Sequence, residues 1–245
     1  QLLFLARHGQ TDMNAAGRLQ GRGVNAQLNE AGRLQADELG RFLRMVPFGA
    51  VMSSSLDRAH ETAGRIAAQN IHYRGTVTGG SSLVTSSEKE ETKGREILSG
   101  VTETLMEPHV DLTVLQNEGV DELSWGILEG QDAAQEPWKT KLAALKWAWD
   151  DGQFDLAAEK GENLLQVEAR AREALEDLLD EGHELNLVAS HGRTLRILML
   201  SLAGISLKEM TRMGKIPNVG LYIVEARRTR PGSARSYRLL TPSPQ

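Results

Sequence analysis

The chain has 245 residues, of which 40% are hydrophobic and 25% are charged, and its formal net charge is −5. This is enough apolar material to bury the core of one α/β domain. The net negative charge opposes binding to nucleic acid or to an anionic membrane, and we find no local basic patch that would offset it. The absence of cysteine excludes disulfides, zinc-thiolate sites and thiol nucleophiles, so any catalysis must use oxygen or nitrogen groups.

The chain opens with a short apolar run at residues 2–6, which is followed by Arg7, His8 and Gly9. A short, continuously apolar run indicates a strand that is buried on both faces. It is too short for a membrane span or a signal sequence, so we expect a soluble, cytoplasmic protein. Because the sequence begins at Gln1 and not at methionine, it is compatible with the removal of a targeting segment that preceded it.

Short apolar runs and amphipathic helical patterns then alternate along the chain. Further strands are predicted at residues 50–52, 187–190, 219–224 and 237–240, with the last two toward the edge of the sheet. Helices are predicted at residues 31–46, 56–68, 138–149, 163–180 and 194–202. Asn29 is placed to cap the first of these helices. The alternation predicts a layered α/β fold with a largely parallel sheet.

Residues 75–118 interrupt this pattern. From residue 75 to 94 the composition shifts to Gly, Ser, Thr, Glu and Lys, and residues 96–118 are apolar without clean periodicity. We interpret residues 75–118 as an insertion in a single domain that spans residues 1–245. Two roles are open for it: a segment that caps the site, or a surface excursion without function. Residues 227–235 and the C-terminal end are predicted as a loop and a frayed tail.

Histidines follow two of the predicted strands at the same relative position. His8 follows the first strand and His191 follows the strand at residues 187–190, so both imidazoles are expected at the sheet edge where α/β folds bind ligands. Arg7 precedes His8, and Arg58 lies in the first turn of the helix after a third strand. No third carboxylate or imidazole with metal-ligand spacing adjoins the histidines. Guanidinium groups match phosphate oxygens, so the pattern favours a phosphoryl group over a metal ion.

Five blocks of sequence resemble, in order, the motifs of the histidine phosphatase (phosphoglycerate mutase-like) superfamily. They are Arg7-His8-Gly9 with the segments up to Ala36, Ser53 to Thr62, Glu122 to Gly130, Gly161-Glu162-Asn163, and Ser190-His191-Gly192. The resemblance spans residues 2 to about 224, and residues 75–118 are the main stretch that it leaves uncovered. It implies a three-layer αβα sandwich around a largely parallel sheet. It also implies an enzyme that acts on a small phosphorylated substrate without a metal or another cofactor.

The resemblance also implies a role for each matched residue. His8 is the nucleophile that attacks phosphorus, and the phosphoryl oxygens are bound by Arg7, Arg58 and His191. Glu122 protonates the leaving oxygen and then activates the water that hydrolyses the phosphohistidine, with Glu129 as the competing candidate. Contacts to phosphate or nearby substrate are implied at Asn14, Gln20, Gly21 and Gly192. For the first three, ordinary turn chemistry is the alternative.

Three functions fit these residues. We expect a phosphatase that hydrolyses small phosphomonoesters, such as sugar phosphates or related metabolites, through a phosphohistidine on His8. A cofactor-dependent phosphoglycerate mutase is the alternative; Met13-Asn14 and an acidic, Trp-bearing helix depart from its pattern. A catalytically silent scaffold for a phosphorylated partner is the third, disfavoured because every matched catalytic position is occupied. The sequence indicates neither the individual substrate nor the oligomeric state.

Overall fold

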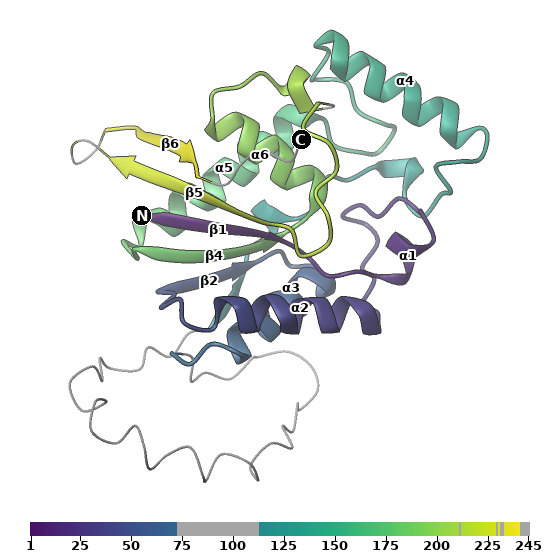
Figure 1. The fold of residues 1–245 in the computed structure, drawn as a ribbon. Coiled ribbons are helices and arrows are strands. Elements are labelled where there is room, and N and C mark those ends of the chain that lie inside the picture. Colours follow the sequence, from purple (N-terminus) through teal and green to yellow (C-terminus); the bar gives the residue numbers. More distant parts are fainter. Residues whose placement is uncertain (73–112, 211, 229, 231–232, 241–245) are drawn as a thin grey trace, which may run out of the picture.

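The fold is that of a computed structural model and is drawn in Figure 1. The structure describes residues 1–72, 113–210, 212–228, 230 and 233–240. These residues form one six-stranded sheet with the strand order β3-β2-β4-β1-β5-β6. The strands are, in chain order, β1 (Leu2–Arg7), β2 (Ala50–Ser53), β3 (Val114–Gln116), β4 (Leu185–Ser190), β5 (Leu221–Arg228) and β6 (Arg235–Leu239).

Four neighbouring strands of this sheet are parallel. β2 pairs in parallel with both β3 and β4, and β4 pairs in parallel with β1. β5 joins the other side of β1 as an antiparallel strand, and β6 is antiparallel to β5. Parallel neighbours need crossover connections, which the intervening helices supply. The predicted α/β fold with a largely parallel sheet is therefore confirmed.

Helices cover both faces of the sheet (Figure 1). Alternate β1 side chains face opposite sides: Leu3 and Leu5 belong to one buried cluster, and Phe4 and Ala6 to the other. The Phe4 cluster includes side chains of α2 (Glu30–Leu43) and α3 (Asp57–Ala68). The Leu3 cluster includes side chains of α4 (Trp138–Asp151), α5 (Leu164–Asp180) and α6 (Gly192–Leu202). This is the three-layer αβα arrangement that the resemblance implies.

Local sequence explains where the main helices begin. The Asn29 side chain accepts a hydrogen bond from the backbone nitrogen of Gly32 and so caps α2, as predicted. Asn163 and Gln166 form a capping box at the start of α5. Short helices in the connections are α1 (Asp12–Ala15), η1 (Glu118–Val120), η2 (Gly126–Leu128) and η3 (Leu207–Met210). Within the described parts of the chain, no helix is long and apolar enough to cross a membrane.

Two boundaries differ from the sequence prediction. Val114–Gln116, which lie within the predicted insertion, form the edge strand β3 beside β2. Only the first of its three residues is buried, so β3 lacks the apolar run that marks a strand in the sequence. Residues 75–112 of the predicted insertion lie outside the described residues. The predicted loop at residues 227–235 is shorter than expected, because β5 continues to Arg228 and β6 begins at Arg235.

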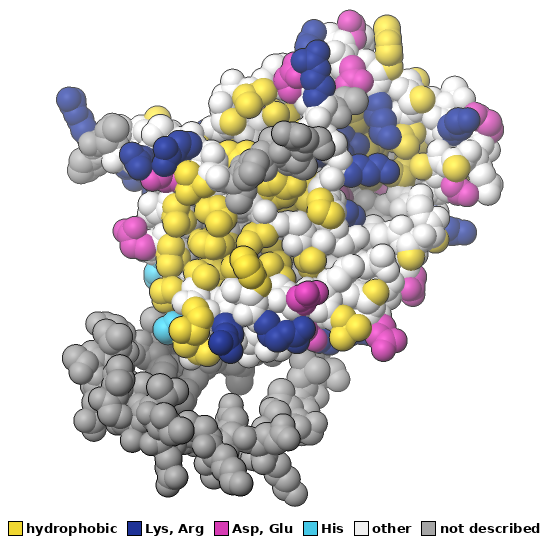
Figure 2. Space-filling model, viewed as in Figure 1, with side chains coloured by type: hydrophobic (Ala, Val, Ile, Leu, Met, Phe, Trp, Pro, Cys, Tyr) yellow, Lys and Arg dark blue, Asp and Glu magenta, His cyan; other side chains and the backbone are white. Residues whose placement is uncertain are grey.

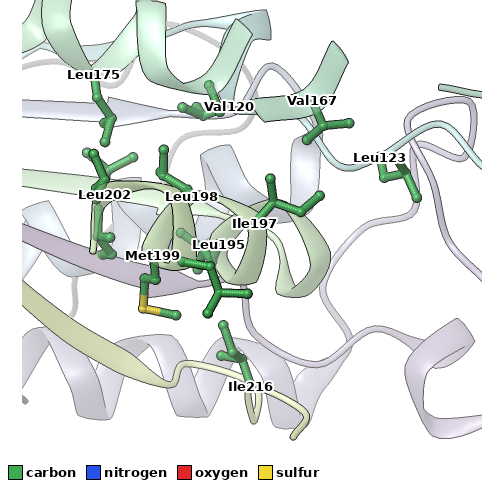
Figure 3. Packing of buried hydrophobic residues seen from close by; sticks show 14 of the residues in the cluster. Val120, Leu123, Val167, Leu175, Leu195, Ile197, Leu198, Met199, Leu202 and Ile216 are labelled. Atoms are coloured by element: carbon green, nitrogen blue, oxygen red, sulfur yellow. The ribbon is translucent and has the colours of Figure 1, made fainter. Parts of the chain in front are cut away.

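The helix α6 is anchored by its apolar face. Figure 3 shows this face packed beside side chains of α5 and of the segment that leads to β5. Five α6 side chains in this cluster are Leu195, Ile197, Leu198, Met199 and Leu202, none more than 7% exposed. Burial of such side chains contributes about 1.5–3 kcal/mol each. The start of α6, directly after β4, is therefore held in a fixed place at the edge of the sheet.

Candidate active site

The two predicted histidines lie side by side. β1 and β4 pair in register up to Arg7 and Ser190, so the next residue of each strand, His8 or His191, projects at the same edge. Their ring centroids are 5.1 Å apart, with the ring planes tilted by 55°. Both residues are almost completely buried. The structure thus brings together the histidines that the strand endings predicted.

Hydrogen bonding places the free lone pair of His8 on one nitrogen. Nδ1 of His8 lies 2.7 Å from the carbonyl oxygen of Gly9, which can only accept a hydrogen bond. Nδ1 therefore carries the hydrogen, and Nε2 keeps its lone pair. Burial, and then repulsion from Arg7 and Arg58, hold the pKa of His8 well below its usual value. The imidazole is therefore neutral near pH 7, the state a nucleophile needs.

Arg7 and Arg58 reach this pocket from β1 and α3. The Arg7 guanidinium donates to the carbonyl oxygen of Ile216 at 2.7 Å, and that of Arg58 donates to the carbonyls of Val24 at 2.6 Å and Gly21 at 3.2 Å. The Nε atoms of both arginines are buried and have no hydrogen-bond partner in the described parts of the chain. Such buried donors call for a ligand that accepts, and an anion would satisfy them.

Ser54 and Asp121 fix the second histidine, and the sequence analysis did not identify either as a functional residue. The Ser54 hydroxyl donates to Oδ1 of Asp121 at 2.7 Å, so it accepts from Nε2 of His191, also at 2.7 Å. Nδ1 of His191 is buried without a partner among the described residues. Burial, and then the charge of Arg58, hold the pKa of His191 well below its usual value. The sequence gives one signal for a functional role of these residues: Asp121 directly precedes Glu122, and Ser54 lies shortly before Arg58.

The two candidate carboxylates occupy different places. Glu122 lies at the start of α6, where its carboxylate accepts from the backbone nitrogens of Thr194 at 3.1 Å and Arg193 at 3.3 Å. Its charge raises the pKa of both Arg7 and Arg58 against the lowering effect of burial.

Glu129 instead stabilises the loop around it. Its carboxylate accepts from the backbone nitrogen of Trp125 at 2.9 Å and from the Ser124 hydroxyl at 3.3 Å. It also packs against Gly21, where a Cβ atom would lie only 2.1 Å from Oε1 of Glu129. Glu122, and not Glu129, therefore lies at the start of α6, the helix that directly follows His191.

The remaining predicted residues shape the loops around the pocket. Oδ1 of Asn14 accepts from the backbone nitrogen of Thr11, and the Gln20 side chain donates to the Thr11 hydroxyl at 2.6 Å. Oδ1 of Asn14 also accepts from the Asn218 amide at 3.2 Å, and the contacts of Asn14 and Gln20 to phosphate stay predictions. At Gly192 a Cβ atom would lie 3.3 Å from Nε of Arg7, so glycine leaves room for that guanidinium. Asn218, which the sequence analysis missed, donates to the carbonyl oxygen of His8 at 3.1 Å.

Comparison with known proteins identifies the family of this chain. The sequence profile of the histidine phosphatase superfamily (branch 1) matches residues 3–75 and 101–237. The chain is 47% identical over 68 residues to the fructose-2,6-bisphosphatase TIGAR of Xenopus tropicalis, a match that covers 28% of this chain and only 25% of that relative. A probable phosphoglycerate mutase GpmB of Erwinia tasmaniensis is 28% identical over 204 residues, covering 83% of this chain and 75% of the relative.

Solved structures show the same fold. A mycobacterial glucosyl-3-phosphoglycerate phosphatase in complex with VO3 aligns with a TM-score of 0.70 at 20% sequence identity, covering 100% of both chains. Bacillus stearothermophilus YhfR aligns with a TM-score of 0.67 at 22% identity, covering 98% of this chain and 95% of that one. The profile match extends over most of the sequence and includes both histidine blocks. The chain is therefore a member of the histidine phosphatase superfamily, branch 1.

Proposed function

We propose that this chain is a metal-independent phosphatase that hydrolyses small phosphomonoesters through a phosphohistidine on His8. One observation carries the proposal. The Nδ1 hydrogen bond of His8 to the Gly9 carbonyl leaves a neutral imidazole with its lone pair on Nε2, near the half-buried Arg7, the buried Arg58 and a second imidazole. A nucleophilic nitrogen surrounded by anion-binding donors suits phosphoryl transfer.

In the first step, Nε2 of His8 forms a bond to phosphorus while the bond from phosphorus to the leaving oxygen breaks. Protonated Glu122 gives its proton to that oxygen, so the product leaves as an alcohol. The buried guanidinium donors of Arg7 and Arg58 bind the phosphoryl oxygens, where they oppose the charge that develops during transfer. Nδ1 of His191 donates to these oxygens only after that imidazole takes up a proton, because its Nε2 hydrogen is already donated to Ser54.

In the second step, water attacks phosphorus and the bond from phosphorus to Nε2 breaks. The Glu122 carboxylate takes a proton from this water, and the electron pair of the broken bond returns to Nε2. The products are inorganic phosphate and the original neutral imidazole. The acid and base roles thus alternate on one carboxylate, which regenerates its own proton for the next cycle.

A phosphoglycerate mutase is the second candidate, because the Erwinia relative named for that activity matches along most of this chain. The two functions differ in the fate of the phosphohistidine. A phosphatase passes the phosphoryl group to water and releases inorganic phosphate. A mutase returns it to the bound acid, so it would interconvert phosphoglycerates without releasing phosphate.

The test is a rapid-quench experiment with a radiolabelled phosphomonoester. We expect acid-labile, base-stable label on the wild-type protein, followed by stoichiometric release of phosphate. The His8→Ala variant should show neither. Near-normal phosphate release by this variant would refute His8 as the nucleophile. Exchange between 2- and 3-phosphoglycerate without phosphate release would support the mutase.

A further inference from the structure

A second group of cations lies next to the proposed phosphoryl site. We call Arg193, Arg196, Lys146 and Lys215 the cationic cluster. The arginines lie in the first turns of α6, Lys146 lies in α4, and Lys215 lies in the segment before β5. They are neighbours, because Arg196 donates to the carbonyl oxygen of Gly214, the residue before Lys215, and Arg193 lies over the ring of Trp149, which is close to Lys146 in α4. Partial burial, and then the charges of Arg193, Lys215 and Arg196, lower the pKa of Lys146.

Two tryptophans hold Arg193 in place. Its guanidinium lies over the rings of Trp125 and Trp149, 5.2 and 5.7 Å from their centroids. Both indoles are almost completely buried, and the Trp149 ring nitrogen donates to the carbonyl oxygen of Leu156 at 2.9 Å. Nε of Arg193 is buried and has no hydrogen-bond partner within the described residues. The guanidinium is thus fixed in position and retains an unsatisfied donor.

The cations of this cluster lie close enough to repel one another. Burial, and then the charge of Arg196, lower the pKa of Arg193 to about 9, although Glu122 and Asp150 both oppose the shift. The whole chain carries a net charge of −5, so an excess of cations at one place is not a consequence of its composition. Charges that destabilise one another in a partly buried place are typical of a site that binds the opposite charge.

Glu122 connects the cationic cluster to the phosphoryl site. Its charge raises the pKa of Arg7 and Arg58 on the histidine side, and it also raises the pKa of Arg193 and Arg196. Its carboxylate accepts from the backbone nitrogen of Arg193 at 3.3 Å. A leaving oxygen that takes its proton from Glu122 is therefore close to the cationic cluster. Figure 2 shows Lys and Arg side chains beside a hollow in this face of the molecule, on the side toward which β1 points.

We propose that the cationic cluster binds a second anionic group, a phosphate or a carboxylate, on the leaving-group part of the substrate. The inference rests on the proposed phosphatase function and narrows its substrate class to phosphomonoesters with a second negative charge. Arg193, held by the two indoles, makes the fixed contact. Lys146 and Lys215, whose side chains reach solvent although Lys146 is partly shielded, attract the anion from solvent. Arg196 has a supporting role, because it donates to the carbonyl oxygens of Gly214 at 2.9 Å and Met210 at 3.3 Å.

The test compares substrates that differ in the second charge alone. 3-Phosphoglycerate carries a carboxylate where glycerol 3-phosphate carries a hydroxymethyl group, and fructose 1,6-bisphosphate carries a phosphate where fructose 6-phosphate carries a hydroxyl. For each pair the measurement is the ratio of kcat/KM values for phosphate release. We expect the wild-type ratio to exceed ten for at least one pair, and the pair with the larger ratio identifies carboxylate or phosphate as the preferred group.

Three variants test which residues produce the preference for a second negative charge. Lys146→Met combined with Lys215→Met should lower the favoured ratio about tenfold, since each exposed charge contact changes an affinity by up to about fivefold. Arg193→Met should lower it further, because its guanidinium is half-buried and fixed. Lys139→Met, an exposed lysine on the same helix, should leave the ratio unchanged. Ratios near one in the wild type, or equal losses for the Lys139 and the Lys146/Lys215 variants, would overturn the proposal.

A binding measurement separates this proposal from the phosphatase function. Calorimetric titration of the His8→Ala variant with the same four compounds compares their affinities without turnover. Tighter binding of the doubly anionic compounds, lost on adding Lys146→Met and Lys215→Met, supports the cationic cluster even if phosphate release is not observed. Equal affinities within both pairs refute it, even if the wild type releases phosphate from all four compounds.

Discussion

Replacing Glu122 with glutamine tests the proton transfer on which the proposed mechanism depends. Oε1 of Glu122 accepts from the backbone nitrogens of Leu123 and Thr194 at 3.0 and 3.1 Å, and from the Thr194 hydroxyl at 3.2 Å. A glutamine with its oxygen in this place keeps those three contacts. Its NH2 group would then face the backbone nitrogen of Arg193, so the one contact made by Oε2 is lost. One lost hydrogen bond costs about 1 kcal/mol of stability, so the variant should fold.

The loss of activity should be much larger than this structural cost. An amide can neither donate nor accept the catalytic proton, and such a loss lowers the rate by ~10²–10⁴-fold. The effect should depend on the leaving group. An alkyl phosphate must leave as a strongly basic alkoxide unless it is protonated, whereas p-nitrophenolate leaves almost unaided. We therefore expect a far larger fall in kcat on a sugar phosphate than on p-nitrophenyl phosphate.

The assay is steady-state phosphate release on both substrates, with a pre-steady-state burst experiment on p-nitrophenyl phosphate. If Glu122 also activates water, the second step becomes limiting, and p-nitrophenol should appear in a burst while phosphoenzyme accumulates. Glu129→Gln is the matched control, because that carboxylate bonds to Trp125 and Ser124 in the supporting loop. Equal losses on both substrates without a burst would refute the role of Glu122, and leaving-group dependence in the Glu129 variant would transfer the role there.

Three further predictions concern the histidines and the absence of a metal. His8 and His191 have folded-state pKa values below the unfolded value near 6.5, so the unfolded chain binds more protons in acid. Protonation of each histidine in the unfolded chain should therefore lower the free energy of unfolding by about 1.4 kcal/mol per pH unit below about 6.5. Urea unfolding should accordingly show a weaker pH dependence for His8→Ala than for the wild type between about pH 6.5 and 5.5. Ser54→Ala removes the hydrogen bond to His191 and should lower kcat about tenfold, whereas Ser55→Ala, which removes contacts to Asp121 alone, should lower it less; equal effects would assign both serines a purely structural role. Phosphate release should persist in excess EDTA, and activity that is lost on chelation and restored by a divalent cation would contradict the proposed metal-independent chemistry.

The sequence alone predicted the architecture, because hydrophobic periodicity is a local property. Apolar runs marked β1, β2 and β4, and amphipathic patterns marked the five long helices, each within a few residues of its observed bounds. The pairing of His8 with His191 was also predictable, since residues that follow parallel neighbouring strands must meet at one edge. β3 was missed because it is short and mostly exposed, so its extended conformation depends on pairing with β2 and not on an apolar sequence pattern.

Contacts between residues far apart in the sequence required the tertiary structure. Asp121 and Ser54 are 67 positions apart, and Ser54 and His191 are 137 apart, so no local pattern links them. The choice between Glu122 and Glu129 likewise depends on which carboxylate reaches the start of α6. The cationic cluster combines charges from α4, α6 and the segment before β5, each an ordinary surface residue when read alone. The sequence determines which chemical groups are present, whereas burial and proximity, which set their pKa values and partners, arise only when the chain packs.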